Sequence, residues 1–155
     1  MPGYRTHDAI GLVTAIPMSS GVFTISNIIL HNQNHALSVA GVFAVSHILN
    51  TILLSPDMDI DSRIYYRWGI LRFIWWPYKQ LVHHRSKFSH SAIGGLIRMV
   101  YILIFCAVIL AAASMDTLNH ISMWLVTHYV YALIVFLGSA SASFIHVMAD
   151  FWRPD

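Results

Sequence analysis

Four apolar stretches constrain the fold of this sequence more than any other feature. They cover residues 9–30, 36–54, 92–114 and 124–149. A helix needs about 20 largely apolar residues to cross the hydrocarbon core of a bilayer. The sequence therefore predicts an all-α fold, an integral membrane four-helix bundle that forms one domain over residues 1–155.

The composition favours the same class of protein. Only 10% of the residues are charged and 57% are hydrophobic, whereas about a quarter of a soluble domain is charged. All of the acidic residues are Asp, although exposed helix surfaces in water use Glu freely. We therefore expect membrane lipids as partners, with a protein partner in the membrane as a further option, and we expect no nucleic acid.

The basic residues predict an orientation. Six of the nine lie between residues 56 and 91, and the connections 30–36 and 115–123 contain none: the six are Arg63, Arg67, Arg72, Lys79, Arg85 and Lys87. Lys and Arg accumulate in cytoplasmic loops. The pattern predicts that both termini and the central loop 55–91 face the cytoplasm.

The middle of this loop, residues 67–82, combines aromatic rings with scattered cations. Such segments favour the headgroup layer of a membrane. We expect a short interfacial helix that ends near Pro77. An ordinary amphipathic connector is the alternative interpretation.

The predicted topology brings ionisable side chains from distant parts of the sequence to the cytoplasmic face. The expected metal ligands are His7, His47, Asp57, His84, His90, His146 and Asp150. Asp59 is the expected base or the residue that orients a histidine, and Arg85 is expected to balance the charge of an anionic substrate. Nitrogen and carboxylate ligands without thiolate favour zinc, with manganese or iron as alternatives.

Spacing supports several of these assignments. His146 and Asp150 are four residues apart and share a helix face. Asp57 and Asp59 alternate after Pro56, so one can bind a metal while the other orients a ligand. Of the adjacent pair His83 and His84, only one is expected to bind the metal, because neighbouring side chains diverge. His84 is the preferred ligand.

Three further residues near the expected site can also be assigned roles from the sequence. His47 lies inside an apolar stretch, where an ionisable group is a functional candidate that usually faces the bundle interior. Arg98 is expected to extend back to the headgroups, or else to act as an anion clamp over the site. Ser89 is a suitable N-cap for the third long helix. A single histidine near a membrane interface is otherwise most often a polar anchor.

The central loop also carries a family resemblance. The run PDMDIDSRIYYRWGILRFIWWPY, followed by HHRSKFSHS, resembles a family of small, uncharacterised, metal-binding membrane proteins of cyanobacteria and archaea. That family is similar to inner-membrane metal-dependent hydrolases with THxxxG, PDxD and HRGxTHS motifs, and more distantly to zinc-dependent phospholipase C and P1-type nucleases. Thr6-His7 with Gly11 matches the first motif, Pro56 to Asp59 the second, and His84-Arg85 with Ser89 to Ser91 the third. In the third motif Ser86 replaces the glycine, Ser89 replaces the threonine, and the gap is one residue longer.

Two functions follow from the sequence. The resemblance and the surplus of ligands indicate a membrane-embedded, metal-dependent hydrolase that acts on a phosphoester, which a lipid can supply, at the cytoplasmic face. The alternative is a non-catalytic, metal-stabilised small subunit or assembly factor of a larger membrane complex. A transporter is a weaker third hypothesis, because a transport path needs polar groups through the full thickness of the membrane.

Overall fold

The computed structural model describes residues 4–83, 86 and 88–152, and this part of the chain contains helices and no strands. The four long helices are α1 (Tyr4–Leu30), α2 (Gln33–Leu53), α5 (Ala92–Ala113) and α7 (Tyr129–Trp152). The shorter elements are the helices α3 (Arg63–Arg67), α4 (Trp76–Leu81) and α6 (Met115–Thr127) and the 3-10 helices η1 (Pro56–Asp59) and η2 (Gly69–Trp75). The all-α prediction is confirmed.

Four helices in the described residues are long and apolar enough to cross a membrane. They correspond to the four apolar stretches of the sequence, with shifted ends. The fourth stretch, expected from residue 124, is divided between two helices. There α6 ends at Thr127 and α7 begins at Tyr129, so that His128 separates two helices. Apolar residues continue through this turn, which is why hydropathy alone did not locate it.

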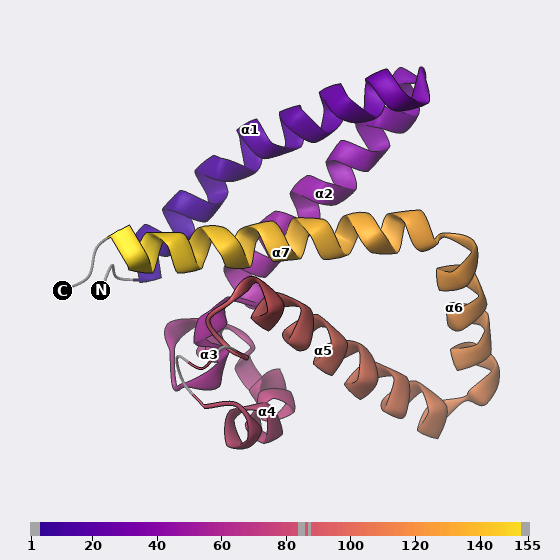
Figure 1. Ribbon diagram of the computed structural model, residues 1–155. Helices are drawn as coiled ribbons and strands as arrows, with labels where there is room; N and C mark the ends of the chain where they lie inside the picture. Colours follow the sequence, from indigo (N-terminus) through magenta and orange to yellow (C-terminus); the bar gives the residue numbers. More distant parts are fainter. Residues whose placement is uncertain (1–3, 84–85, 87, 153–155) are drawn as a thin grey trace.

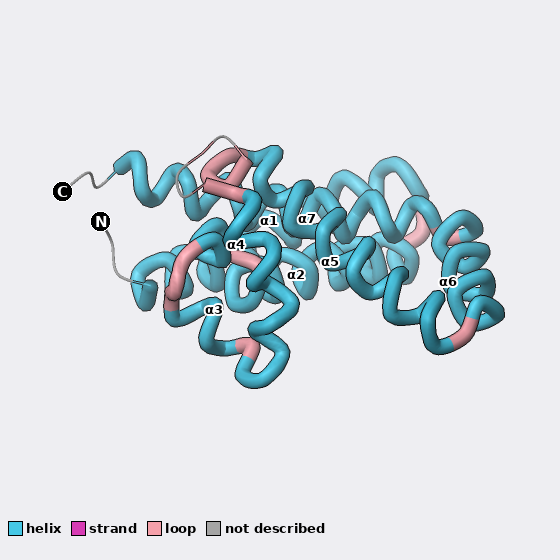
Figure 2. The backbone as a smooth tube through the Cα atoms, turned by 90° about the horizontal axis from the view of Figure 1, so that it is seen from below, coloured by secondary structure: helices cyan, strands magenta, loops and turns pink. Residues whose placement is uncertain are grey.

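The long helices are arranged around α7 (Figure 1). Helices α1 and α2 form an antiparallel pair, α7 crosses them, and α5 meets α7 near one end before diverging from it. Helix α6 closes the far side between α5 and α7, and it lies at the opposite end of the molecule from the two termini (Figures 1 and 2). The parts of α1 and α7 nearest the termini therefore share one end with the central segment 55–90.

Small residues let these helices approach closely. A Cβ atom on Gly138 of α7 would lie 2.6 Å from the Phe43 carbonyl oxygen of α2, and one on Gly95 of α5 would lie 2.6 Å from Ser143 Oγ of α7. Small side chains at helix contacts are typical of membrane bundles, in which packing replaces the hydrophobic effect as the force for association. These contacts fix α7 against both α2 and α5.

The central segment has an apolar core of its own, formed by Met58, Ile64, Tyr65, Ile74, Trp75 and Tyr78. Trp75 is completely buried, and burial raises the pKa of Tyr78. Helix η2 ends at Trp75, close to the end expected near Pro77, and a second helix, α4, begins directly after it with Pro77 in its first turn. A proline needs no N–H partner at that position, so it starts this helix rather than ending it.

Two contacts attach this segment to the end of α2. Trp68 Nε1 donates to the Leu53 carbonyl oxygen at 2.8 Å, and Arg67 donates to the Ile52 carbonyl oxygen at 2.9 Å. The last carbonyls of a helix have no partner within it. Arg67 also pairs with Asp8 of α1, so it joins the end of α2 to the beginning of α1.

Candidate metal centre

Five ionisable side chains from four separate segments converge where the termini and the central segment meet. They are His7 of α1, Asp57 of η1, His90 just before α5, and His146 and Asp150 of α7. One ligand atom from each of His7, His146 and Asp150 lies within 4.8 Å of the others, and the same is true of Asp57, His90 and His146. His146 belongs to both groups, so the five residues form one cluster.

The distances within the cluster suit ligands around one cation. His146 Nε2 lies 3.7 Å from Asp57 Oδ2 and 3.6 Å from Asp150 Oδ2, and His90 Nε2 lies 3.5 Å from Asp57 Oδ1. These separations are too long for good hydrogen bonds. Two ligands at about 2.0–2.2 Å from a zinc ion are roughly 3–4 Å apart. The side chains therefore face one another at the spacing of a coordination shell.

Two further contacts define the cluster. His7 Nε2 lies 3.1 Å from Asp150 Oδ1, and the His7 ring stacks on the His146 ring with centroids 4.0 Å apart. His146 Nε2 is buried and has no hydrogen-bond partner within the described residues. A buried polar atom without a partner is rare in proteins. A metal ligand role accounts for it, because a lone pair directed at a cation needs no hydrogen bond.

Two buried serines orient the histidines. Ser55 Oγ lies 3.2 Å from His146 Nδ1, and Ser89 Oγ lies 3.0 Å from His90 Nδ1. Ser89 also donates to the carboxylate of Asp59. A ligating histidine usually donates its second N–H to an oxygen, which fixes the ring and its tautomer. Here both serines hold Nδ1, so that Nε2 is the nitrogen that faces the cluster.

The sequence-based role of Ser89 changes as a result. The N-cap of α5 is Ser91, whose side chain accepts from the Gly94 N–H, whereas Ser89 is fully buried beside His90. The orienting role of Ser55 was not predicted either. The available signal was that each serine lies within two residues of a predicted ligand, Asp57 or His90, in a segment expected to be irregular.

A buried arginine supports the cluster from within the bundle. Arg98 is fully buried, and it donates to the Leu54 carbonyl oxygen at 2.7 Å, to the Ser89 carbonyl oxygen at 2.9 Å and to Ser143 Oγ at 2.9 Å. The expected extension toward the headgroups is therefore wrong. The acceptors lie at the C-cap of α2, in the loop before α5 and on α7, so Arg98 fixes the backbone of Ser89.

His47 lies away from the cluster, in a hydrogen-bond network between three helices. Its Nε2 is 3.0 Å from the Gly11 carbonyl oxygen of α1, and its Nδ1 is 2.8 Å from Ser141 Oγ of α7. A carbonyl oxygen can only accept, so Nε2 carries the hydrogen that it donates to Gly11. Nδ1 contacts the Ser141 hydroxyl, which itself donates to the Gly138 carbonyl oxygen. Both nitrogens are then occupied by protein groups.

The structure thus brings together five of the seven expected ligands: His7, Asp57, His90, His146 and Asp150. It does not bring His47 to them, and His84 lies outside the described residues, as does Arg85. Asp59 is buried, and its carboxylate accepts from Ser89, whose Oγ also contacts His90 Nδ1. This placement corresponds to orientation of a ligand rather than to a base that faces substrate.

The side chains of the cluster differ in their exposure to solvent. The side chains of Asp57 and Asp150 are 23% and 16% exposed, whereas the three histidines are 6–10% exposed. Two carboxylates together balance the charge of a divalent cation. The two carboxylates are therefore the part of the cluster most accessible to solvent, and the three imidazoles are more deeply buried.

The fold and the candidate metal centre together define a class of protein. It is all-helical in the described residues, has four helices of membrane length, and carries at one end a His/Asp cluster suited to a divalent metal. Residues 2–155 match the family described as "Uncharacterized metal-binding protein (DUF2227)". The chain belongs to this family, and metal binding is the property that the family's name records.

One curated relative is an uncharacterized protein of Aquifex aeolicus, which is 33% identical over 61 residues. The match covers 39% of this chain and 43% of that protein, so it spans less than half of either. No solved structure matches the chain. The family's description and the side chains of the cluster both support metal binding at this site.

Proposed function

We propose that the protein is a membrane-embedded, metal-dependent hydrolase that acts on a phosphoester, with a centre that holds zinc at the cytoplasmic face. The observation that carries this proposal is the size of the ligand set. Five His and Asp side chains converge on one cluster, whereas a structural zinc site is closed by four ligands. More ligands than a closed site needs, with two of them open to water, favour a centre that exchanges ligands.

Each residue of the centre would have a separate role in this activity. His7, His90 and His146 would hold the cation through nitrogen, and Asp57 and Asp150 would neutralise it from the solvent side. A divalent ion supplies Lewis acidity, which activates water and polarises a phosphoryl oxygen. Asp59 would keep His90 in place through Ser89. Arg85 would balance the charge of an anionic substrate.

The proposed location follows from two separate observations. The centre lies at the end of the bundle that contains both terminal regions and the central segment, as the contacts His7–Asp150 and Asp8–Arg67 require. That end also contains most of the basic residues, which favours the cytoplasmic side of a membrane. A lipid phosphoester at that interface is the proposed substrate class.

The test is an activity assay with purified protein loaded with zinc, manganese or iron. Generic phosphodiesters and phospholipids serve as substrates, and His146→Ala is compared with His128→Ala, which alters a half-buried histidine outside the cluster. We expect turnover in the wild type and in His128→Ala, and loss in His146→Ala. Absence of turnover under every metal loading would contradict the hydrolase proposal and leave metal binding intact.

A second function is favoured because the ligands of the centre come from separate parts of the chain. Its ligands come from α1, η1, the start of α5 and α7, so a bound ion would hold four segments together. A small subunit or assembly factor of a larger membrane complex needs only this stabilisation. Copurification of a stoichiometric protein partner, with a lower melting temperature after chelation and no turnover, would favour this alternative.

A further inference from the structure

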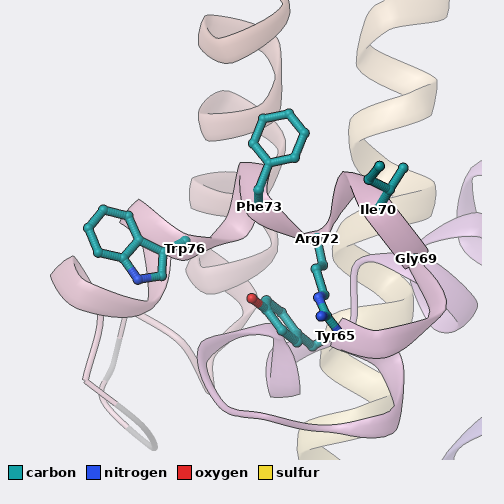
Figure 3. Close-up of a pocket in the computed structure, with 6 residues that line it drawn as sticks. All are labelled: Tyr65, Gly69, Ile70, Arg72, Phe73 and Trp76. Carbon is teal, nitrogen blue, oxygen red and sulfur yellow. The ribbon is translucent and has the colours of Figure 1, made fainter.

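The central segment carries an exposed pocket with an apolar rim, and none of the residues that line it belongs to the metal cluster. The pocket has a volume of about 470 Å³ and is lined by Tyr65, Gly69, Ile70, Arg72, Phe73 and Trp76 (Figure 3). Ile70 is 88% exposed, Phe73 57% and Trp76 61%. Contiguous large apolar side chains on a surface mark a contact with a membrane, a ligand or another protein.

These side chains are exposed because their neighbours are fixed inside. Ile74 and Trp75 belong to the core of the central segment, and Trp75 has no exposed surface. The segment cannot turn Phe73 or Trp76 inward without removing Trp75 from that core. The apolar rim is therefore a stable part of the folded surface, and it needs a covering environment.

Contacts with α5 indicate that the acyl chains of a membrane are this covering environment. The rings of Phe73 and Phe105 are 6.4 Å apart, and the Tyr101 hydroxyl donates to the Ile74 carbonyl oxygen. Phe105 and Tyr101 belong to a helix of membrane length and composition, Ile93–Ala113. If α5 crosses a bilayer, the rim lies beside it in the same leaflet, and acyl chains cover Ile70 and Phe73.

Arg72 gives the pocket a polar side. Figure 3 shows Ile70 and Phe73 on one side of the segment, with Arg72 directed to the opposite side, toward Tyr65. The guanidinium lies 5.2 Å from the centroid of the Tyr66 ring. The nearby carboxylates are engaged elsewhere, since Asp61 pairs with Lys79 and Asp8 pairs with Arg67, and Arg72 forms no ion pair within the described residues.

The two sides of the pocket match the two parts of one kind of molecule. Arginine binds phosphate through paired N–H donors, tryptophan and tyrosine favour the headgroup level of a bilayer, and exposed aliphatic groups favour acyl chains. We propose that this pocket binds an anionic phospholipid, with the phosphate on Arg72 and the chains along Ile70 and Phe73. The inference rests on the proposed membrane placement and is independent of hydrolysis at the metal centre.

The test uses the full chain in nanodiscs, with Trp124→Phe and Trp152→Phe to remove two exposed tryptophans outside the pocket. Trp76 is then the most exposed tryptophan, since Trp75 is buried and Trp68 is partly buried. Two nanodiscs have the same mixture of phosphatidylcholine and phosphatidylglycerol. One carries bromine on the phosphatidylglycerol chains and the other carries it on an equal amount of phosphatidylcholine, and bromine quenches nearby tryptophan.

We expect brominated phosphatidylglycerol to quench Trp76 more strongly, with roughly fivefold enrichment of that lipid at the pocket, which corresponds to about 1 kcal/mol for a cationic residue near anionic lipid. Arg72→Gln should abolish the preference. Arg63→Gln is the matched control, because Arg63 is exposed and lies 5.6 Å from the centroid of the Tyr4 ring, outside the pocket lining; it should keep the preference.

Equal quenching by the two lipids would overturn the headgroup site while supporting the membrane placement. No quenching by either lipid would overturn both, including the case in which a second copy or another protein covers Trp76. A preference that survives in Arg72→Gln would also overturn the proposal. The wild-type comparison decides the question even if a variant fails to fold, and the metal content of the samples reports on the centre separately.

Discussion

Replacing Ser89 with alanine tests how the metal centre is oriented. Ser89 is fully buried, its Oγ lies 3.0 Å from His90 Nδ1, and it donates to the Asp59 carboxylate. The substitution removes one oxygen, leaves every expected ligand in the sequence, and breaks the link between Asp59 and His90. The variant therefore separates orientation of a ligand from the ligand itself.

The size of the effect follows from these contacts. Loss of a group that orients a metal ligand costs about 10–100-fold in metal affinity, which is about 1.4–2.8 kcal/mol. The hydrogen bond to the Asp59 carboxylate is worth about 1.5–3 kcal/mol of folding free energy, since hydrogen bonds to charged groups fall in that range. Metal affinity and stability of the metal-free protein should therefore both fall.

The assay is competition for zinc with a chromophoric chelator, using purified protein in detergent, together with thermal unfolding of the metal-free form. Ser62→Ala is the matched control, because Ser62 accepts from the Tyr65 N–H at the start of α3 and does not contact the cluster. It should lose stability but keep its affinity for zinc. Unchanged zinc affinity in Ser89→Ala would refute the assignment of Ser89 as an orienting residue.

Three further perturbations distinguish the centre from its surroundings. His47→Ala should lower the melting temperature, because two buried hydrogen bonds worth about 1 kcal/mol each and the packing of the ring are lost, while the metal content of the purified protein stays at the wild-type level. Gly11→Ala should destabilise by about 1–3 kcal/mol through overpacking, since the new Cβ would lie 2.4 Å from Thr51 Cγ2; the added Thr51→Ala should restore the melting temperature measured by circular dichroism. Zinc affinity measured by competition should fall as the solution is acidified, because a metal binds only the deprotonated form of an imidazole or carboxylate ligand, and affinity independent of pH would contradict ligation by these side chains.

Much of the fold could be predicted from hydropathy because four long apolar stretches leave few alternatives to a helical membrane protein. The predictions failed where tertiary contacts decide. The chain remains helical beyond Pro77 because Tyr78 of α4 packs in the same apolar core as Trp75. The turn at His128 has no hydropathy signal, since apolar residues lie on both sides of it.

The candidate site was likewise predictable where helix spacing decides and not where tertiary contacts decide. Spacing on a helix indicated that His146 and Asp150 share a face, and the cluster contains both. Residue type alone could not separate His47 from the other histidines. Its nitrogens are engaged by a carbonyl of α1 and a hydroxyl of α7, and only the packing of three helices brings those groups together. Arg98 is similar, because its three acceptors come from distant parts of the chain.

Elemental analysis of the purified wild type, His146→Ala, His90→Ala and His47→Ala would show whether the cluster binds a metal. We expect stoichiometric divalent metal in the wild type and in His47→Ala, and loss of that metal in the other two variants. Equal metal content in all four proteins would show that the five converging side chains hold no cation.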